Sequence, residues 1–463
     1  MLSARPRQRR LAPFVRSAVP LLVLAVTGLV AVPPAAEVAG ESVTEIGGFN
    51  SVACPSSSQC LGVGITFATA TSGAVGAAAP LTGDAAPGGA SQPVQTIPGT
   101  ELLSAVSCDS GRQCLAVGEN PSASDGVAVR LDPATGALVA GQSVHSIAGI
   151  SLAAVACPST TRCLAVGHTP DGQGAAVSLN PASGAIAAGT AVQMVPGTGG
   201  EGLEGVACAD PTECLAVGEN AGSSAGVAVP LNPATGARTK GQSAQNVTTK
   251  GILVGVSCPS VTICLAVGWG ADEPSVTVPL DPSTGMVPSG QRDQTISSSA
   301  AKLNAVSCPS VAQCLAVGND NGDPSNGQAV ALSPVTGDIS SGQAIQSVTG
   351  SGALNGAFCV SATQCVVAGS GFEASGGAWL VLSAATGSPS SPLATTPPST
   401  PSTGSAAPPP TTVIAAGSRP LPPAGGNLLP VLAGGIAFVA GGVALVGVTS
   451  RRHRKRTTTA GGE

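Results

Sequence analysis

The sequence contains no tyrosine, and its two tryptophans and six phenylalanines leave aromatic residues at 2% of the chain. A core must therefore be built from alanine, valine and leucine. With such a core, any single unit of about 50 residues would bury too little surface to fold alone. Histidine is scarce too, with three residues, which cannot supply ligands for a series of zinc sites. Charged residues make up only 9% of the 463 residues.

Cysteine is plentiful by contrast, and its 14 residues follow one pattern that occurs seven times. Copies such as VACPSTTRCLAVG and VSCPSVTICLAVG hold two cysteines six positions apart, and each copy starts about 50 residues after the previous one, which indicates a repeat architecture. The two cysteines flank a short hairpin loop, where their Cβ atoms come close enough to bridge, and CxxxxxC is not a common zinc spacing. We therefore expect a disulfide within each copy: Cys54–Cys60, Cys108–Cys114, Cys157–Cys163, Cys208–Cys214, Cys258–Cys264, Cys308–Cys314 and Cys359–Cys365.

Each repeat reads as four short strands separated by turns. In the copy that runs from Gly251 to Ala300, the apolar runs GILVGVSC and CLAVG are joined by the five-residue connection PSVTI, and SVTVPL and SGQRDQTI follow on either side of the turn DPSTG. No segment of the repeat has a helical period. The prediction is an all-β fold, a seven-bladed β-propeller of four-stranded blades over residues 37–387, with a β-solenoid or an open array as the alternative.

The two ends of the repeat region predict how the ring closes. The segment Glu41–Cys54 matches Gln142–Cys157, so the chain begins with a fourth strand that lacks the three strands before it. The last repeat has three strands and ends near Gly387. We expect residues near Ser42–Gly47 to supply the outer strand of blade seven, which removes two exposed sheet edges.

The composition of the termini predicts an exported protein held at the cell surface with the propeller outside. Residues 1–36 read as a signal peptide, because arginines precede an apolar run and small residues follow it. Residues 388–420 form a Ser/Thr/Pro-rich stalk. Residues 428–449 are apolar and long enough for a transmembrane helix, and the basic segment 450–463 indicates a cytoplasmic tail.

The order of these C-terminal parts resembles the LPxTG sorting signals of Gram-positive surface proteins. In the segment 421–426, Leu421, Pro422, Pro423 and Gly425 match that motif, and Ala424 stands where threonine is expected. The resemblance implies attachment to peptidoglycan by a sortase, or anchoring by the helix alone if the motif is not cut. The cysteine repeat resembles repeats of secreted actinobacterial proteins, and the LDPATG turn is similar to the LDxxTG turn of quinoprotein-type propellers, without the tryptophan that follows it there.

Charge and loop variation indicate which face of the propeller binds. Residues 37–427 contain 23 acidic and 9 basic side chains, a balance that disfavours nucleic-acid partners. The loops that follow CLAVG vary most between copies, whereas the hairpins and turns of the other face are uniform. We expect a protein or glycan ligand on the varied face. Its loops hold nine acidic residues and no lysine or arginine: Glu119, Asp125, Asp171, Glu219, Asp272, Glu273, Asp320, Asp323 and Glu373.

Within these loops, five residues are candidates for ligand binding. Trp269, beside Asp272 and Glu273, either anchors a ligand or packs over its own blade. Asp320 and Asp323 lie in a segment rich in oxygen ligands and are candidates for Ca²⁺, without EF-hand spacing. The alternative for each acidic residue is that it makes a turn and keeps the surface soluble.

No motif in the sequence predicts catalysis. There is no GxSxG and no HExxH segment, and the tyrosine nucleophile of propeller-type sialidases has no counterpart. The prediction is a surface-anchored binding or adhesion propeller that is not an enzyme. The alternatives are a carbohydrate-active hydrolase or lyase that uses two carboxylates across the central channel, and a passive structural component of the cell envelope.

Overall fold

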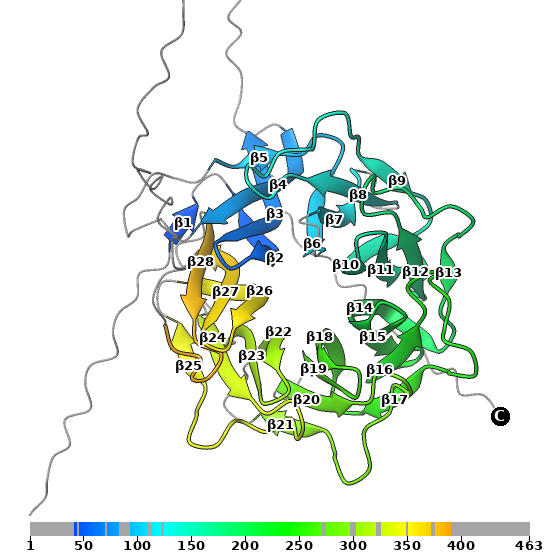
Figure 1. The fold of residues 1–463 in the computed structure, drawn as a ribbon, viewed down its shortest axis with the longest axis vertical. Helices are drawn as coiled ribbons and strands as arrows, with labels where there is room; N and C mark the ends of the chain where they lie inside the picture. The colour runs from blue at the N-terminus through cyan, green and yellow to red at the C-terminus, as the bar shows by residue number, and fades with distance from the viewer. Residues whose placement is uncertain are drawn as a thin grey trace, which may run out of the picture. The chain divides into compact units, whose positions relative to one another are not determined.

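The computed structural model describes residues 41–43, 46–69, 72–82, 93–109, 113–121, 125–270, 275–296, 302–320, 326–348, 351–371 and 376–389. These residues form seven four-stranded antiparallel sheets, arranged as blades around a central channel (Figure 1). The predicted seven-bladed β-propeller is confirmed, and the described residues contain no helix. The predicted signal peptide, stalk, sorting motif, transmembrane helix and cytoplasmic tail lie outside the described residues. No helix among the described residues is long and apolar enough to cross a bilayer.

Blades 1 to 6 each consist of four consecutive strands, and the first strand of each blade lies innermost (Figure 1). Blades 1 and 2 contain β2 (Gly48–Ser56), β3 (Gln59–Thr69), β4 (Ser72–Thr82), β5 (Gln95–Thr96), β6 (Leu102–Cys108), β7 (Cys114–Glu119), β8 (Gly126–Leu131) and β9 (His145–Ile147). Blades 3 and 4 contain β10 (Ser151–Ser159), β11 (Arg162–His168), β12 (Gly174–Leu179), β13 (Gln193–Met194), β14 (Thr198–Asp210), β15 (Glu213–Asn220), β16 (Ser223–Leu231) and β17 (Gln245–Thr248). Blades 5 and 6 contain β18 (Ile252–Ser260), β19 (Ile263–Trp269), β20 (Ser275–Leu280), β21 (Gln294–Ile296), β22 (Lys302–Ser310), β23 (Gln313–Asn319), β24 (Gly327–Leu332) and β25 (Gln346–Val348).

Blade 7 is built from both ends of the repeat region. It contains β26 (Ser351–Ser361), β27 (Gln364–Gly371) and β28 (Gly377–Leu382), and its outer strand is β1 (Glu41–Val43). Glu41 pairs with Trp379 and Val43 with Gly377 in antiparallel register. The predicted ring closure by the N-terminal segment is confirmed, with the strand starting one residue earlier and ending sooner than expected.

All seven predicted disulfides are present, with Cα atoms 3.8–4.0 Å apart within each pair. The strands continue further through these hairpins than the sequence suggested. In blade 5 the strands extend to Ser260 and Ile263, which pair directly, so the expected five-residue connection is a two-residue turn. A register shift between Ser257 and Ser260 accommodates the cysteine and the proline.

The hydrophobic core is divided among the seven junctions between blades. In the second strand of blade 2, Cys114 and Ala116 pack toward blade 1, whereas Leu115 and Val117 pack toward blade 3. Both faces of this strand are buried, which explains why CLAVG is continuously apolar rather than alternating. Because every core cluster is shared by two blades, no blade has a core of its own, as expected for a repeat that cannot fold alone.

The repeated turns on the disulfide side dock each of blades 2 to 7 onto the blade before it. Asp132 begins such a turn and accepts the backbone N–H of Ala134 at 2.9 Å, as Asx-turns do. The glycine that closes this turn, Gly136, has φ +72° and lies against the backbone of Ala78 in the preceding blade. The last turn reaches Pro389, which bridges to Leu382, two residues beyond the predicted end of the propeller. These contacts give the uniform face a structural role.

Candidate binding site at the central channel

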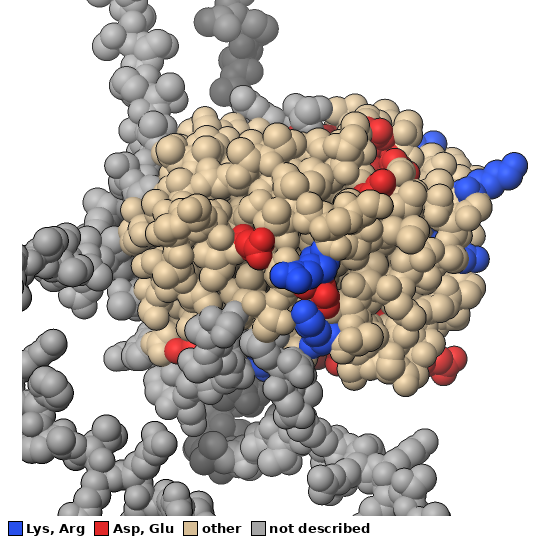
Figure 2. Space-filling view, turned by 90° about the horizontal axis from the view of Figure 1, so that it is seen from below, with Lys and Arg blue, Asp and Glu red and all other residues tan. Residues whose placement is uncertain are grey.

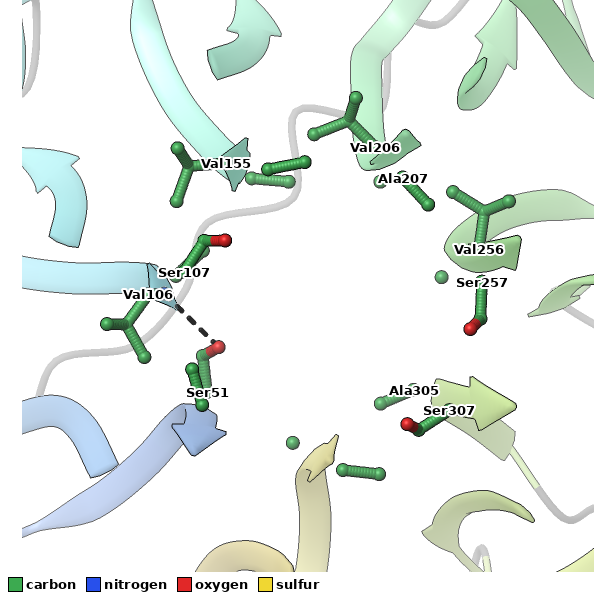
Figure 3. Close-up of a pocket in the computed structure, with 18 of the residues that line it drawn as sticks. Ser51, Val106, Ser107, Val155, Val206, Ala207, Val256, Ser257, Ala305 and Ser307 are labelled. Carbon is green, nitrogen blue, oxygen red and sulfur yellow. Dashed lines mark hydrogen bonds between the residues drawn. The ribbon is translucent and has the colours of Figure 1, made fainter. Parts of the chain in front are cut away.

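The inner strands of all seven blades line a channel with a cavity of about 420 Å³ (Figure 3). Its wall consists mostly of small side chains. Figure 3 shows Val106, Val155 and Val206 pointing away from the channel toward the junctions between blades, while Ser107 and Ser257 lie at the wall. The cysteines Cys157, Cys208 and Cys258 line the channel as well, at the hairpin ends of the inner strands.

Each inner strand contains a β-bulge at the same position, and the bulged residue lines the channel. In blade 2, for example, Leu103 pairs with Gly118 and Ala105 with Val117, so the residue between them has no partner. Bulges bend a strand and redirect its side chains, and they are frequent at functional sites. The seven bulged residues are Asn50, Ser104, Ala153, Glu204, Val254, Asn304 and Asn355.

The bulge explains the glycine that ends each CLAVG segment. At Gly118, a Cβ atom would lie 2.1 Å from the carbonyl oxygen of Leu102 on the neighbouring inner strand. The same contact measures 1.9 Å at Gly167 and Gly268. No other residue fits there without displacing backbone, so this glycine is required by the bulge.

The asparagines among the bulged residues connect neighbouring blades. Asn50 donates its side-chain N–H to the carbonyl of Leu103 at 3.0 Å. Asn304 donates to the carbonyl of Leu354 at 3.1 Å, and Asn355 donates to that of Phe49 at 3.0 Å. The acceptor is in each case the residue before the bulge in the next blade, so these three bonds repeat one arrangement around the part of the ring where the chain closes.

Glu204 is the only residue with an ionisable group among the described residues that line the channel. Burial, followed by the negative charges of Glu201, Glu219 and Glu119 in that order of effect, raises the pKa of Glu204 to about 7. Glu119 belongs to blade 2, and Glu201, Glu204 and Glu219 belong to blade 4. Three carboxylates from two blades therefore act on Glu204.

Hydrogen bonds hold the surrounding carboxylates in place. Glu119 accepts the hydroxyl of Ser151 on the next blade. Glu219 accepts the backbone N–H of Glu201 at 3.1 Å, in a part of β14 where extra residues interrupt the register between Thr198 and Leu203. None of the four carboxylates forms an ion pair with a lysine or arginine within the described part of the chain. Their mutual repulsion is thus not offset by the protein itself.

The four carboxylates do not form a metal site. No group of three or more His, Cys, Asp or Glu side chains among the described residues is close enough to hold a metal ion. The arrangement instead suits a larger cation whose charge is spread over several ångströms, such as an amine on a sugar or the basic side chains of a protein.

Two of the five ligand-binding residues predicted from the sequence, Trp269 and Asp320, are described by the structure, and both contact other groups of the protein. Trp269 is half-buried, and the ammonium group of Lys302 on the next blade lies 4.5 Å from its ring centroid, so one face of the ring is occupied by the protein. Asp320 accepts the backbone N–H of Asn326 at 2.7 Å and its side-chain N–H at 3.0 Å, which closes the loop between them. The other three candidates, Asp272, Glu273 and Asp323, lie outside the described residues, as do all residues of the sorting motif.

Other acidic residues of the varied loops also make local contacts. Asp125 accepts the backbone N–H of Gly149 at 3.1 Å and so joins two loops of blade 2. His168 is the last residue of β11 and half-buried, and its Nδ1 has no hydrogen-bond partner among the described residues. For Asp125 and Asp320 the turn-forming alternative describes the structure well.

Glu204 and Glu201 were not predicted as site residues from the sequence. Glu204 lies in the apolar run GLEGVAC, where it is the one charged residue of its inner strand near the bulge. That exception to the apolar pattern was the available signal. Its meaning depends on the bulge, which points the residue at position 204 into the channel.

No family model matches the sequence, and no curated protein sequence matches it. Solved structures with a similar fold include the PQQ-bound form of aldose sugar dehydrogenase from Streptomyces coelicolor, with 12% identity, a TM-score of 0.39, and a match covering 60% of this chain and 92% of that one. They also include Kuenenia stuttgartiensis hydrazine synthase, with 8% identity, a TM-score of 0.50, and a match covering 75% of this chain and 98% of that one. At 8% identity, the likeness to hydrazine synthase shows the fold alone.

Proposed function

We propose that this protein is a non-catalytic binding propeller, displayed on the outside of the cell, which takes a cationic part of a glycan or protein ligand at the Glu204 end of its channel. The observation that carries the proposal is the group of four carboxylates, Glu119, Glu201, Glu204 and Glu219. Within it, burial and the charges of the other three raise the pKa of Glu204. A cation placed among them would relieve their repulsion and keep Glu204 ionised.

Two lysines at the blades that follow blade 4 are already engaged by other groups of the protein and leave the charge of the four carboxylates unpaired among the described residues. Lys250 forms an ion pair with Asp293 at 3.4 Å, and Lys302 lies over Trp269. Figure 2 shows one side of the ring, where most of the surface is uncharged and the few acidic and basic side chains are scattered.

A binding measurement on the full-length chain tests this function. At pH 8 we expect an oligolysine peptide and a chitosan oligomer to bind, and the N-acetylated chitin oligomer of equal length to bind more weakly. Glu204→Gln and Glu219→Gln should each weaken binding of the cationic probes about tenfold, because each removes one close charge. Glu213→Gln, in a hairpin at the disulfide side, is the matched control and should bind as the parent does. Equal binding by all three variants would reject the proposed site.

A second candidate, a carbohydrate-active hydrolase, is favoured by one observation. A carboxylic acid with a pKa near 7 beside other carboxylates is the arrangement that a glycosidase uses for its general acid. Release of reducing ends from a soluble polysaccharide, lost in Glu204→Gln, would support this alternative. Binding of a cationic glycan without turnover would support the non-catalytic function.

A further inference from the structure

The position of Glu204 in the repeat indicates a second property, which does not depend on the proposed ligand. Glu204 is the bulged residue of blade 4, and the same position holds the bridging residues Asn50, Asn304 and Asn355 in blades 1, 6 and 7. Each asparagine donates to the carbonyl of the residue before the bulge in the next blade. For blade 4 the corresponding acceptor is the carbonyl of Leu253.

The junction between blades 4 and 5 lacks the other polar bond of the inner strands. At three junctions a serine on the inner strand accepts a backbone N–H of the next blade: Ser107 from Cys157, Ser257 from Cys308 and Ser307 from Cys359. In blade 4 the equivalent residue is Ala207, which has no hydroxyl. At the rim, Thr248 of blade 4 donates to Asp293 of blade 5 at 2.7 Å. Glu204 is therefore the polar side chain available at the channel end of this junction.

We propose that Glu204 forms a pH-dependent bond between blades 4 and 5: its neutral carboxyl donates to the carbonyl of Leu253, as the asparagines do at their junctions, and its ionised carboxylate cannot. A carboxylate is an acceptor only, and it repels the carbonyl oxygen that an asparagine would bind. Protonation thus converts a repulsive pair into a hydrogen bond and leaves the rest of the junction unchanged.

The surroundings of Glu204 favour the neutral form. Glu201 lies on the same strand as Glu204, Glu219 lies on β15 and Glu119 lies on β7. The negative charges of all three raise the pKa of Glu204. His168 ends β11 on the preceding blade. The remaining charged groups of the packed strands, Arg162, Asp210 and Glu213, lie at the hairpin ends, and β10, β12, β16 and β18 contain no charged residue.

The direction of the pH effect follows from linkage. The pKa of Glu204 is raised in the folded chain to about 7 from the ordinary value of 4.5, so the folded state binds the proton more tightly than the unfolded state. The stabilisation is complete below pH 4.5, declines as the pH rises toward 7, and is absent above it.

Substitutions that imitate other blades test the proposal on the full-length chain. Glu204→Asn places the residue of blades 1, 6 and 7 in blade 4, and Glu204→Ala places that of blade 3 there. Between pH 5 and pH 8 the melting temperature of the parent should fall by about 2 °C or more beyond the fall seen in either variant. At pH 8, Glu204→Asn should melt above both the parent and Glu204→Ala, since only asparagine donates at that pH.

Two further variants complete the test. Asn50→Asp should melt below the parent at pH 8, because an aspartate with its ordinary pKa of about 3.9 is ionised there and cannot donate to the carbonyl of Leu103. Asp338→Asn, an exposed carboxylate elsewhere, should keep the parental pH dependence. If Glu204→Ala melts as high as Glu204→Asn at pH 8, the bond to Leu253 does not exist. If the parent loses no more stability than the variants do, Glu204 does not titrate between the blades.

Discussion

At the scale of single residues, two departures from the repeat pattern, Gly62 and Phe49, accommodate each other. Five copies read CLAVG, but the first reads CLGVG, with Gly62 in place of alanine. A Cβ at Gly62 would lie 2.7 Å from the ring of Phe49, which stands where Leu103 and Leu152 stand in the next two blades. Phe49, Trp379 and Ile46 share the core cluster at the closing junction, so the scarce aromatic residues are concentrated where the chain closes. Gly62 lacks a side chain and so leaves room for the ring of Phe49.

This pairing predicts a coupled pair of substitutions. Gly62→Ala should reduce the free energy of unfolding by about 1–3 kcal/mol, because the added methyl group overpacks the core. In the Phe49→Leu background, Gly62→Ala should reduce the free energy of unfolding by at least about 1 kcal/mol less, since leucine and alanine are the residues that blades 2 and 3 have at these two positions. Urea unfolding of the four chains measures this coupling. Additive losses would mean that Gly62 is not needed to accommodate Phe49.

At the scale of elements, the sequence predicted the number, order and type of strands because the cysteine pattern and the turns repeat. It did not predict the bulge in each inner strand. An apolar extra residue in a bulge, such as Val254, leaves no mark in an apolar run, and only the partner strand defines it. The invariant glycine opposite the bulge was visible, but its reason is a carbonyl contact from another strand.

The outer strand of blade 7 provides the prediction at this scale. Deleting residues 41–43 removes the partner of β28 and exposes the edge on which Trp379 lies. We expect a lower melting temperature and aggregation at high concentration, because an unpaired edge is a template for other chains. Differential scanning calorimetry and light scattering measure both effects. An unchanged melting curve would mean that the ring does not need this strand to close.

At the scale of the whole molecule, the site could be predicted only in part. Glu119 and Glu219 were among the nine acidic residues of the varied loops, and both act on Glu204. Glu201 and Glu204 were not predicted, because the channel is assembled from residues about 50 positions apart in successive repeats. Which inner-strand side chains meet there depends on ring closure and on the bulges, and neither is a local property of the sequence.

The proposed display at the cell surface predicts where truncated chains are found. A chain that ends before Leu421 should appear in the medium, because both the predicted sorting motif and the apolar segment 428–449 are removed. If a sortase accepts the motif, mass spectrometry of peptidoglycan digests should find Ala424 as the last residue of the attached protein. Extraction of the intact chain by detergent would instead indicate anchoring by the apolar segment. Retention of the truncated chain inside the cell would contradict both.

The most direct test of the channel site is a carboxyl NMR titration of the full-length chain with ¹³C-labelled glutamate, in which Glu204→Gln assigns the signal. Without ligand, Glu204 should titrate near the pKa of about 7 that its burial and its three glutamate neighbours impose. With saturating oligolysine, its midpoint should fall by at least about one unit, because a cation among the carboxylates stabilises the ionised form. A Glu204 signal that titrates near 4.5 and does not move when oligolysine is added would contradict the assignment of this channel as a cation-binding site.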